Sequence, residues 1–468
     1  MRLQSTINRV SFLCIVLIAL PLGKAGHVHG QESSDEGALE TPETVSPKVM
    51  VDPEGRIIMV YGHVPGTDGL RELDPESAEM KDKELDDLKL LPLLHSAGAR
   101  AGIDYEGRII WISAGEAADA DLVHVNGLSH LKELNLECAQ ITDRGLANLG
   151  DLPSLERLHL NFSQVTDAGL EHIKKFKSLN EIGLAGTNVS DAGLVHLKHL
   201  PNLEQLNLNC LPATNRHMQI TDEGLKHIGH LVQLKLLILS HTQVSDQGLS
   251  QLKSLQHLEN LDLDRTQVTH EGLAHLKDLP ELRRLALGGK KIKDNAVIEL
   301  ADFGSLESLS LSFTDVSDSG MAFLGALSGL KELFLSSQRI TDNGLRHLPA
   351  LKNLEVLSLR VEKATDSGMA YVGQLQNLRW LEIWGNNDQF TAKGYESLGN
   401  LRKLEELTLE MIRLDESAVT ELSKITSLKR LYLDYMSTSK SAVQRLGELM
   451  PNTEISGFAS GSQLGFRD

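Results

Sequence analysis

Positive charge is scarce in this chain of 468 residues. Lys and Arg number 46 against 64 Asp and Glu, so the formal net charge is −18. A general binder of the nucleic-acid backbone needs a basic face, because each phosphate contact neutralises a negative charge. The composition therefore predicts that nucleic acid is not the partner, although a local basic patch stays open.

Familiar catalytic and metal-binding signatures are absent as well. The sequence contains no HExxH, GxSxG, Walker-type Gly-Lys loop or CxxC. Zinc sites, nucleophile elbows and phosphate-binding loops need their residue types at such spacings. His159 has no obvious Cys or Ser partner, so no nucleophile–base pair is visible. We therefore predict no enzymatic activity, no cofactor and no metal.

Long hydrophobic runs are also few. The run VSFLCIVLIALPLG at residues 10–23 follows a positively charged start and is too short to span a bilayer comfortably. With small residues leading up to Ala25, it predicts a signal peptide at 1–25, cleaved after Ala25 or after Gly30; an uncleaved anchor is the alternative. No other run is long enough to cross a membrane. We expect an exported protein, periplasmic, cell-surface or extracellular, with no stable membrane span after cleavage.

Two segments precede the main part of the chain. Residues 26–47 are acidic and poor in large apolar side chains, which is typical of a flexible linker. The region 48–127 then holds two copies of one pattern, VDPEGRIIMV at 51–60 and IDYEGRIIWI at 103–112. Each copy combines a turn sequence with a β-prone run, so each predicts a turn that leads into a strand.

From residue 128 the chain is periodic. Each unit carries apolar residues at positions +0, +3, +6 and +8, as in LPSLERLHL at 152–160, followed by a half of the form TDxGLxxL. The alternating apolar pair predicts a short strand, and the Leu residues spaced three apart predict a short helix. The units open, mostly 24 residues apart, at Leu128, Leu152, Phe176, Leu200, Leu231, Leu255, Leu279, Phe303, Leu327, Leu351, Leu375, Leu401 and Ile425.

This L-x-x-L-x-L pattern resembles the leucine-rich repeat family over residues 128–449, in about thirteen units. The TDxGL form is most similar to repeats of F-box-associated proteins and of bacterial secreted leucine-rich repeat proteins. The resemblance implies an α/β fold: a right-handed horseshoe solenoid with a parallel sheet on the concave face and helices on the convex face. It also implies that the protein binds other proteins.

The flanking regions are expected to cap the solenoid, because terminal repeats must cover the exposed core. In the N-terminal cap, 48–127, a helix is predicted from an N-cap at Asp74 to a stop at Gly98. A degenerate unit starting at Asp104 would place Ile110 and Ile112 at +6 and +8. At the other end, the degenerate residues 450–468 are expected to form a C-terminal cap and tail.

The repeated Thr-Asp pair is predicted to be structural. A hydroxyl at the helix start can accept an unpaired N–H, and Asp in the first turn suits the positive end of the helix dipole. Gly two residues later would allow close packing of the helix start. A catalytic group would be needed once, whereas the motif [Ser/Thr]-Asp-x-Gly-[Leu/Met] begins at 142, 166, 190, 221, 245, 317, 341 and 365.

The histidines and cysteines are given structural interpretations too. Zinc binding needs three or four ligands that converge on one point. Like residues at one position of neighbouring helices form a solvated ridge instead, as expected for His172, His196, His227, His275 and His347. Cys138 and Cys210 both stand at +10 but three units apart, about 14 Å at a strand spacing of about 4.8 Å. A disulfide between them is therefore not expected.

Specificity is expected on the concave face. Since +6 and +8 point inward, +5, +7 and +9 point outward from each strand. Aromatics are only 4% of the chain, yet all three Trp residues fall at such positions, Trp111 beside the N-terminal hairpin and two in the late units. Aromatic rings beside Arg are common in binding hot spots, although these rings could also stack on each other. The predicted partner-binding residues are Phe334, Arg360, Trp380, Glu382, Trp384, Glu410, Arg430, Tyr432 and Asp434.

The sequence therefore favours an exported, non-catalytic leucine-rich repeat module that recognises a protein through its concave face. One alternative is a glycan- or cell-wall-binding protein that uses the Trp and Tyr residues. Another is an F-box-like ubiquitin-ligase substrate adaptor, which the export signal and the missing F-box segment argue against. An extra stretch at 210–218 lengthens one unit to 31 residues and is a further candidate contact.

Overall fold

A computed structural model describes the greater part of the chain. The described residues are 48–51, 57–61, 87, 90, 94, 98–104, 107–210, 219–387, 389–434, 440–459 and 462–463. The predicted signal peptide, the predicted linker and all but Cys210 of the 210–218 stretch lie outside them. The boundaries predicted for these segments stay predictions.

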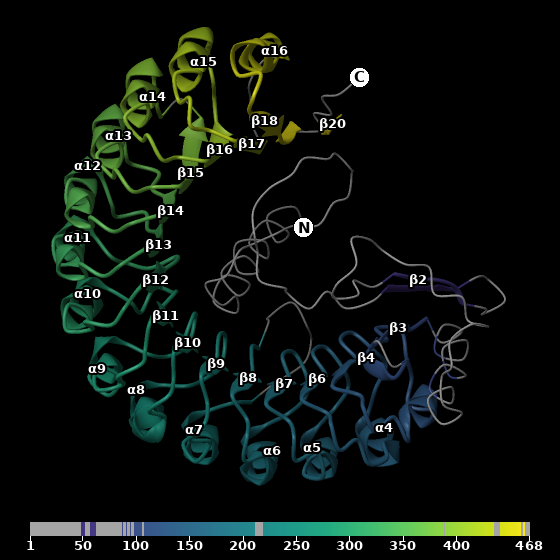
Figure 1. Ribbon diagram of the computed structural model, residues 1–468. Coiled ribbons are helices and arrows are strands. Elements are labelled where there is room, and N and C mark those ends of the chain that lie inside the picture. Colours follow the sequence, from purple (N-terminus) through teal and green to yellow (C-terminus); the bar gives the residue numbers. More distant parts are fainter. Residues whose placement is uncertain are drawn as a thin grey trace, which may run out of the picture. The chain divides into compact units, whose positions relative to one another are not determined.

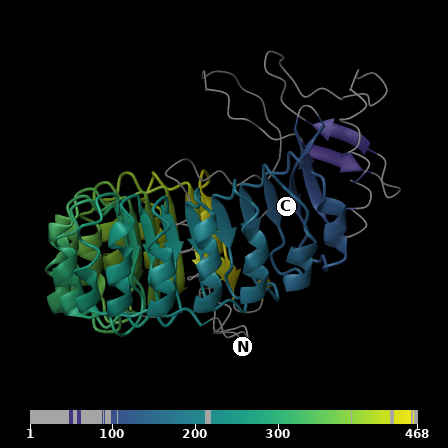
Figure 2. The ribbon, with the colours of Figure 1, turned by 90° about the horizontal axis from the view of Figure 1, so that it is seen from below.

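The chain divides into two compact units, Met1–Ile220 and Thr221–Asp468, each of which is described by itself. The division between them falls inside the 31-residue repeat that starts at Leu200, shortly after the extra stretch at 210–218. In each unit, strands line one face and helices the other (Figure 1). Neighbouring helices stand side by side in a row, as Figure 2 shows.

The first unit contains two sets of strands. β1 (Lys48–Val51) and β2 (Ile57–Tyr61) form an antiparallel pair. β3 (Arg100–Ile103) pairs antiparallel with β4 (Ile109–Ser113), and from β4 onward the pairing is parallel. The parallel strands are β5 (Glu133–Asn135), β6 (Arg157–His159), β7 (Glu181–Gly183) and β8 (Gln205–Asn207). The helical segments are η1 (Asp121–Val125), α4 (Asp143–Asn148), α5 (Asp167–Ile173), α6 (Asp191–Leu194) and η2 (Val195–His199).

The second unit continues the same strand–helix alternation with longer late strands. Its parallel strands are β9 (Leu236–Ile238), β10 (Asn260–Asp262), β11 (Arg284–Ala286), β12 (Ser308–Leu311), β13 (Glu332–Ser336), β14 (Val356–Arg360), β15 (Trp380–Asn387), β16 (Glu406–Ile412), β17 (Arg430–Asp434) and β18 (Glu454–Ser456). β19 (Phe458–Ala459) and β20 (Ser462–Gln463) form a separate antiparallel pair.

The helices of the second unit follow the strands in turn. They are α7 (Asp222–Ile228), α8 (Asp246–Leu249), η3 (Ser250–Ser254), α9 (His270–Leu273), α10 (Asp294–Leu300), α11 (Asp318–Met321), η4 (Leu324–Ala326), α12 (Asp342–Leu345), η5 (Leu348–Ala350), α13 (Asp366–Val372), α14 (Ala392–Leu398), α15 (Glu416–Leu422) and α16 (Lys440–Leu449).

The apolar repeat positions build the core of each coil, which is one strand–helix unit. Leu152, Leu155, Leu158 and Leu160, at +0, +3, +6 and +8, are at most 2% exposed. Parallel pairing brings equal positions of successive coils together, as between Leu158 and Ile182. Burial of these rows drives the fold, since each coil alone has too little apolar surface to close a core. The predicted leucine-rich repeat solenoid is confirmed.

One predicted register at the N-terminus is wrong by two residues. Ile112 pairs with Leu134, so Ile112 stands at +6 and Ala114 at +8, whereas Ile110 is only half-buried. The cause is the turn between β3 and β4, where Asp104 binds the backbone and the guanidinium of Arg108. This hairpin uses the residues that the sequence pattern assigned to the start of a repeat.

The described parts of the two end regions fit the expected elements. Both predicted turn–strand copies end in strands, β2 and β4. Of the predicted helix, Asp87 and Leu94 are helical, and Gly98 has the positive φ of +71° typical of a helix stop. At the C-terminus, β18 lies within the residues predicted as a cap and pairs in register with β17. The capping role of 48–127 stays a prediction.

Candidate functional site

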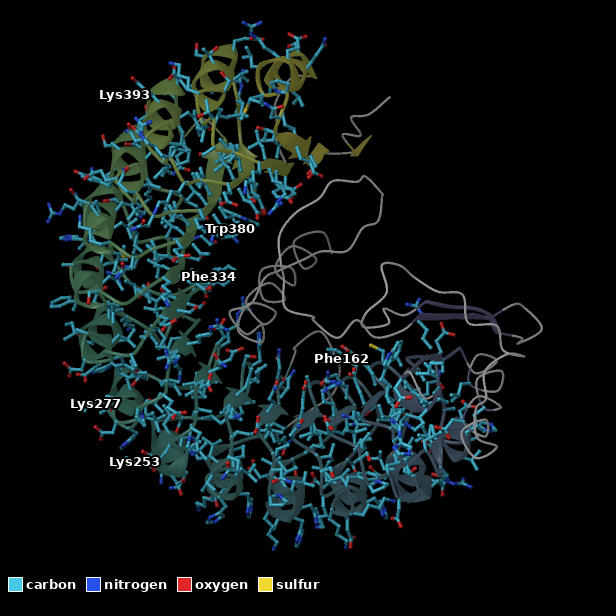
Figure 3. All side chains as sticks on the ribbon, in the orientation of Figure 1. Phe162, Lys253, Lys277, Phe334, Trp380 and Lys393 are labelled. Atoms are coloured by element: carbon cyan, nitrogen blue, oxygen red, sulfur yellow. The ribbon has the colours of Figure 1, made fainter. Side chains whose placement is uncertain are left out.

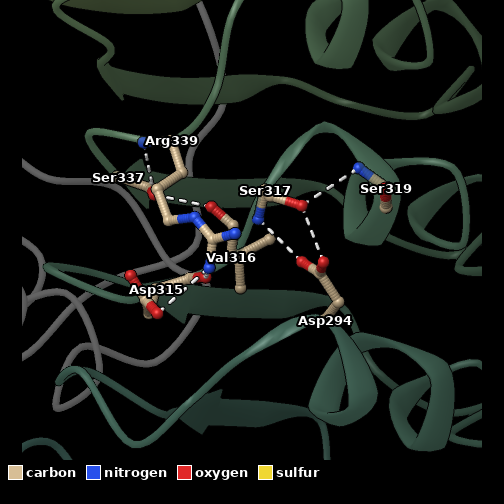
Figure 4. A network of polar contacts seen from close by, with 7 residues as sticks. All are labelled: Asp294, Asp315, Val316, Ser317, Ser319, Ser337 and Arg339. Carbon is tan, nitrogen blue, oxygen red and sulfur yellow. Dashed lines mark hydrogen bonds and ion pairs between the residues drawn. The ribbon is translucent and has the colours of Figure 1, made fainter.

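The helix starts carry a polar connection from each coil to the next, shown for one pair in Figure 4. Asp294, the first residue of α10, accepts hydrogen bonds from the backbone N–H and the hydroxyl of Ser317 in the next coil, at 2.7 and 2.6 Å. The hydroxyl of Ser317 in turn accepts a bond from the N–H of Ser319, at 3.3 Å. The carboxylate therefore holds the N-cap residue that begins α11.

The same connection recurs through the described residues, and we call it the aspartate ladder. The pairs are Asp119–Thr142, Asp143–Thr166, Asp167–Ser190, Asp222–Ser245, Asp246–Thr269, Asp294–Ser317, Asp318–Thr341, Asp342–Thr365 and Asp366–Thr391. The predicted N-cap role of the hydroxyls is confirmed for most of these helices. The aspartate does more than the sequence indicated, since it joins neighbouring coils.

The glycine of the motif makes room for this carboxylate. A Cβ atom at Gly320 would lie 2.6 Å from Oδ1 of Asp294, and the other ladder glycines are equally close to theirs. Four helix starts lack the aspartate, with His270, Ala392, Glu416 and Lys440 in its place. In the coils that follow the first three, the glycine is replaced by alanine, at Ala296, Ala418 and Ala442. The sequence therefore keeps glycine where the neighbouring carboxylate requires it.

The histidine and cysteine predictions meet no contrary geometry. Among the residues that the structure describes, no group of three or more His, Cys, Asp or Glu side chains could hold a metal ion. Cys138 and Cys210 are not joined in a disulfide.

The predicted partner-binding residues gather on five adjacent strands, β13 to β17. Parallel pairing sets Arg360, Trp384, Glu410 and Asp434 in one row across four strands. A second row contains Phe334, Glu382 and Tyr432, and a third contains Trp380 and Arg430. Figure 3 shows Phe334 and Trp380 on the strand side of this unit, with Lys277 and Lys393 on the helix side.

The aromatic residues of this face are packed against their neighbours. The rings of Phe334 and Trp380 are 6.5 Å apart and tilted by 51°. The guanidinium of Arg360 lies 4.3 Å from the Trp384 ring. Phe334 and Trp384 are each only 7% exposed, whereas Trp380 and Tyr432 are half-buried. Trp384 is thus part of the packed surface, and Trp380 and Tyr432 are the rings that a partner could reach.

Trp111, the third tryptophan, lies across the N-terminal hairpin. A Cβ atom at Gly102 of β3 would lie 1.8 Å from its Nε1 atom, so the indole packs directly on the glycine. Glycine is required here because any side chain would displace the ring. Trp111 therefore packs on the neighbouring strand β3 and stays half-exposed.

Three carboxyl groups lie next to the aromatic rows. Burial, followed by the nearby Glu382 and Asp434, raises the pKa of Glu410 to about 8. Burial also raises the pKa of Glu382, which accepts a 2.5 Å hydrogen bond from the hydroxyl of Ser358. The indole N–H of Trp384 lies near Glu410 and offsets part of its rise, without a hydrogen bond of normal geometry. Glu410 is therefore largely uncharged at neutral pH.

A second carboxyl pair lies on β10 and the residues after it. Part of Asp264 reaches the surface, but its carboxyl group is buried, and burial together with Asp262 raises its pKa to about 8. Its Oδ1 atom accepts a 2.5 Å bond from the N–H of Gly288. Burial raises the pKa of Asp262 to about 6. This pair also carries less negative charge at neutral pH than the sequence indicates.

Sequence reasoning missed two residues that lie just beyond the strands. Arg265 and Phe313 both stand at +10 and have positive φ values, 55° and 57°. Two equivalent positions, Gly186 and Gly289, carry glycine, which adopts this conformation without strain. The available signal in the sequence was a bulky side chain at +10. Where such a side chain points depends on the φ angle at that residue, which the repeat pattern does not report.

Tyr432 and Arg430 close the face at β17. Arg430 forms an ion pair with Glu406 on the neighbouring strand β16. Burial and the nearby Glu406 raise the pKa of Tyr432, so its hydroxyl stays protonated at neutral pH. The face therefore ends in a hydroxyl and a positive group, both half-exposed.

Comparisons with known proteins agree with the repeat fold. Residues 226–396 match the family described as Leucine-rich repeat region, and residues 127–150 and 151–174 match the family described as Leucine Rich repeat. No curated protein matches. No helix in the described part of the chain is long and apolar enough to cross a membrane.

Solved structures with a similar repeat arrangement share 19% sequence identity with this chain. They include an internalin of Listeria monocytogenes, with a TM-score of 0.45 over 79% of this chain and 94% of that one. A leucine-rich repeat protein of Leptospira interrogans has a TM-score of 0.40 over 72% and 91%. TLR13 in complex with ssRNA13 has a TM-score of 0.45 over 73% and 57%.

Proposed function

Because the chain is built of leucine-rich repeats, we propose that it is an exported recognition protein that binds a protein partner through its strand face. The repeat fold supports a protein–protein recognition module. The observation that carries the choice of face is the convergence of nine chemically varied side chains on β13–β17. Export rests on the N-terminal sequence pattern.

The partner-facing part of this surface is narrower than the full set of nine residues. Trp384 and Phe334 are held in packed positions, so they support the surface from within. Trp380, Arg430 and Tyr432 keep exposed area and are the groups expected to contact a partner. Aromatic and Arg side chains supply much of the energy of protein interfaces. No catalytic role is proposed for this face.

Replacement of Trp380 and Tyr432 tests the proposed face. The chain, labelled with biotin at its C-terminus, would be used to capture partners from its native source, with the Trp380→Ala, Tyr432→Ala double variant in parallel. We expect the variant to lose the main partner at least about tenfold. A matched control replaces two exposed apolar residues on the helix side, Ile298 and Phe323, which are 41% and 42% exposed. If the strand-face variant and the helix-side control capture the main partner equally well, the strand face is not the binding surface.

Glycan binding is the second candidate, because the accessible Trp380 and Tyr432 rings could also stack on sugars. A glycan array probed with the same variants separates the two functions. Binding to defined glycans that is lost in the Trp380→Ala, Tyr432→Ala variant would favour the glycan function. The F-box-like adaptor function has no supporting observation on this face.

A further inference from the structure

Arg265, Phe313, Arg360 and Trp384 form an alternating row of cations and rings on the strand side of the second unit. Arg265 lies 5.0 Å from the Phe313 ring centre, and Arg360 lies 5.4 Å from the same centre. Arg360 also lies 4.3 Å from the Trp384 ring. Each guanidinium is therefore held against an aromatic face at a distance typical of cation–π contacts.

The row depends on small residues in the coils between its members. Arg265 and Phe313 belong to coils separated by one coil, which places Gly288 and Gly289 at the positions between them. The Cβ position at Gly289 is 3.5 Å from Cα of Arg265, so a larger side chain would occupy the gap. Short serines at 336 and 337 occupy the matching positions between Phe313 and Arg360. The long side chains meet because their neighbours are small.

Arg265 and Phe313 share a backbone conformation that recurs at position +10 of the coils. Both occupy the left-handed region, with φ of 55° and 57°, and Cys138, Phe162, His241 and Met411 do so as well. The conformation is therefore a feature of the repeat, and in the coil between Arg265 and Phe313 it is adopted by Gly289.

The two arginines of the row form no close ion pair with the described residues. Neither Arg265 nor Arg360 forms an ion pair within 4 Å with any residue that the structure describes, whereas many other arginines of the second unit do. The carboxyl group of Asp264, next to Arg265, has its pKa raised to about 8 by burial and by Asp262. It is therefore mostly protonated at neutral pH and neutralises little of the arginine charge.

Arg360 is partly compensated. The exposed Glu362 is the first carboxyl group that acts on it, whereas the second, Glu410, has its pKa raised to about 8 by burial, Glu382 and Asp434. Burial lowers the pKa of Arg360, but the ordinary pKa of arginine is so high that the guanidinium stays charged at neutral pH. The row therefore presents two fixed, planar cations within a protein of net charge −18.

We propose that Arg265 and Arg360, held by Phe313 and Trp384, bind carboxylate groups of an acidic segment in a protein partner. This pair of stacked arginines, which we call the arginine platform, deepens the proposed recognition function and rests on it. A guanidinium fork matches a carboxylate in a bidentate manner, and stacking on a ring fixes the plane of the fork. A short acidic segment is favoured over a nucleic acid because two guanidinium forks can bind a few carboxylates, whereas a nucleic acid needs an extended basic face to neutralise its phosphates.

The first test uses two peptides that differ only in charge. Acetylated hexaglutamate amide and its hexaglutamine counterpart would be titrated against the full chain at pH 7 by calorimetry, with Trp fluorescence as a second signal. We expect hexaglutamate to bind at least about tenfold more tightly. General electrostatics would act in the opposite direction, since protein and peptide are both negative. Equal binding of the two peptides would overturn the proposal, and so would tighter binding of a single-stranded RNA hexamer.

The second test uses arginine pairs of equal charge. Arg265→Gln with Arg360→Gln is expected to weaken hexaglutamate binding at least about tenfold. The control pair, Arg283→Gln with Arg379→Gln, removes the same charge from arginines already paired with Glu307 and Glu405, and should change affinity less than about twofold. Equal losses in both pairs would reduce the effect to overall charge and overturn the proposal.

A lysine variant separates positioning from charge. Arg360→Lys keeps the positive charge but loses the planar fork, so it is expected to weaken binding nearly as much as Arg360→Gln. Full affinity in the lysine variant would contradict a stacked, bidentate site. All variants would be checked for native circular dichroism and unfolding midpoint before titration.

Failure of this platform can be told apart from failure of the recognition function. If hexaglutamate does not bind but the Trp380→Ala, Tyr432→Ala variant still loses the native partner, the face is correct and the acidic chemistry is wrong. If the partner is captured equally by every variant of the strand face, the recognition function assigned to that face is wrong as well.

Discussion

The helix starts and the strand face of each coil differ in how strictly their residues repeat. At the helix starts, Asp, Ser or Thr, and Gly recur in coil after coil, because each carboxylate must meet the N-cap of the next coil. On the strand face, equal positions hold different residues, as in the row of Arg360, Trp384, Glu410 and Asp434. Stability is therefore expected to depend on the repeated helix starts, and recognition on the varied strand face.

The largest expected effect at the helix edge comes from its glycine. Gly320→Ala places a methyl group 2.6 Å from the Asp294 carboxylate and should lower the free energy of unfolding by about 2–4 kcal/mol, through overpacking and broken hydrogen bonds. Urea unfolding followed by circular dichroism measures this. The matched control is Gly447→Ala in α16, where a Cβ atom meets nothing within 4 Å and where helix propensity predicts a small gain.

Loss of one ladder carboxylate is expected to be less severe. Asp294→Ala removes the two hydrogen bonds that Ser317 donates and leaves the backbone N–H of Ser317 unpaired. The free energy of unfolding should therefore fall by about 1–3 kcal/mol in the same experiment. His270→Ala alters the equivalent position of a coil that has no such bond, so it should change stability by less than about 0.5 kcal/mol. Equal effects at both sites would show that the ladder contributes nothing specific.

The strand face should instead appear in the pH dependence of stability. The folded pKa of Glu410, about 8, lies above its unfolded value of about 4.3, so the folded state keeps a proton that the unfolded state loses. Stability should therefore fall as pH rises from about 5 to about 8. Glu410→Gln removes this contribution and should reduce the decline, while the Asp262 and Asp264 contributions persist.

Glu405→Gln is the matched control for this pH experiment. Lys429 and Arg379 lower the pKa of Glu405, so its contribution is lost at low pH rather than at high pH. The control should therefore leave the decline between pH 5 and 8 unchanged. A decline of equal size in the wild type and the Glu410→Gln variant would contradict a protonated Glu410.

Repair of a broken ladder step is the smallest effect expected. His270→Asp, Lys293→Thr and Ala296→Gly together would reproduce the connection between α9 and α10, where Lys293 now provides no side-chain cap. A gain of about 0.5–1.5 kcal/mol is expected from the new hydrogen bonds and the cap. His270→Asp alone should give no gain, because the methyl group of Ala296 would occupy the place of the carboxylate. A gain from the single variant would contradict the steric role of the glycine.

A charged row shows how far sequence periodicity alone can be followed. At position +4, acidic and basic residues alternate through the second unit in the order Lys235, Glu259, Arg283, Glu307, Lys331, Glu355, Arg379, Glu405 and Lys429. Several neighbours form ion pairs, such as Glu307 with Arg283 at 3.0 Å and with Lys331 at 2.9 Å. Parallel pairing at equal positions makes such a row readable directly from the repeat register.

The sequence predicted the coils well because one short pattern sets them. The spacing of Leu152, Leu155, Leu158 and Leu160 predicts both the strand and the buried side, and the same pattern returns in each coil. Where the pattern degenerates, prediction failed, as in the two-residue error at Ile112. A hairpin formed there instead, and its turn depends on a local contact between Asp104 and Arg108 that periodicity does not report.

The candidate site was predicted as a set of outward positions, but its internal contacts were not. The sequence placed Trp384 and Glu410 on the strand face, yet it could not tell that one ring is covered by Arg360 or that one carboxyl is protonated. Both properties depend on burial and on side chains from neighbouring coils. They arise only when the register and side-chain rotamers are known.

By itself, the sequence determined the repeat, the strand and helix edges of each coil, and the positions that face outward, because these follow from local periodicity. The tertiary structure alone decided that the ladder aspartates bind the next coil and that Arg265 meets Phe313 across a glycine-containing coil. The physical reason is distance: such contacts join side chains about 24 or 48 residues apart in sequence, and stacking of the coils brings them together.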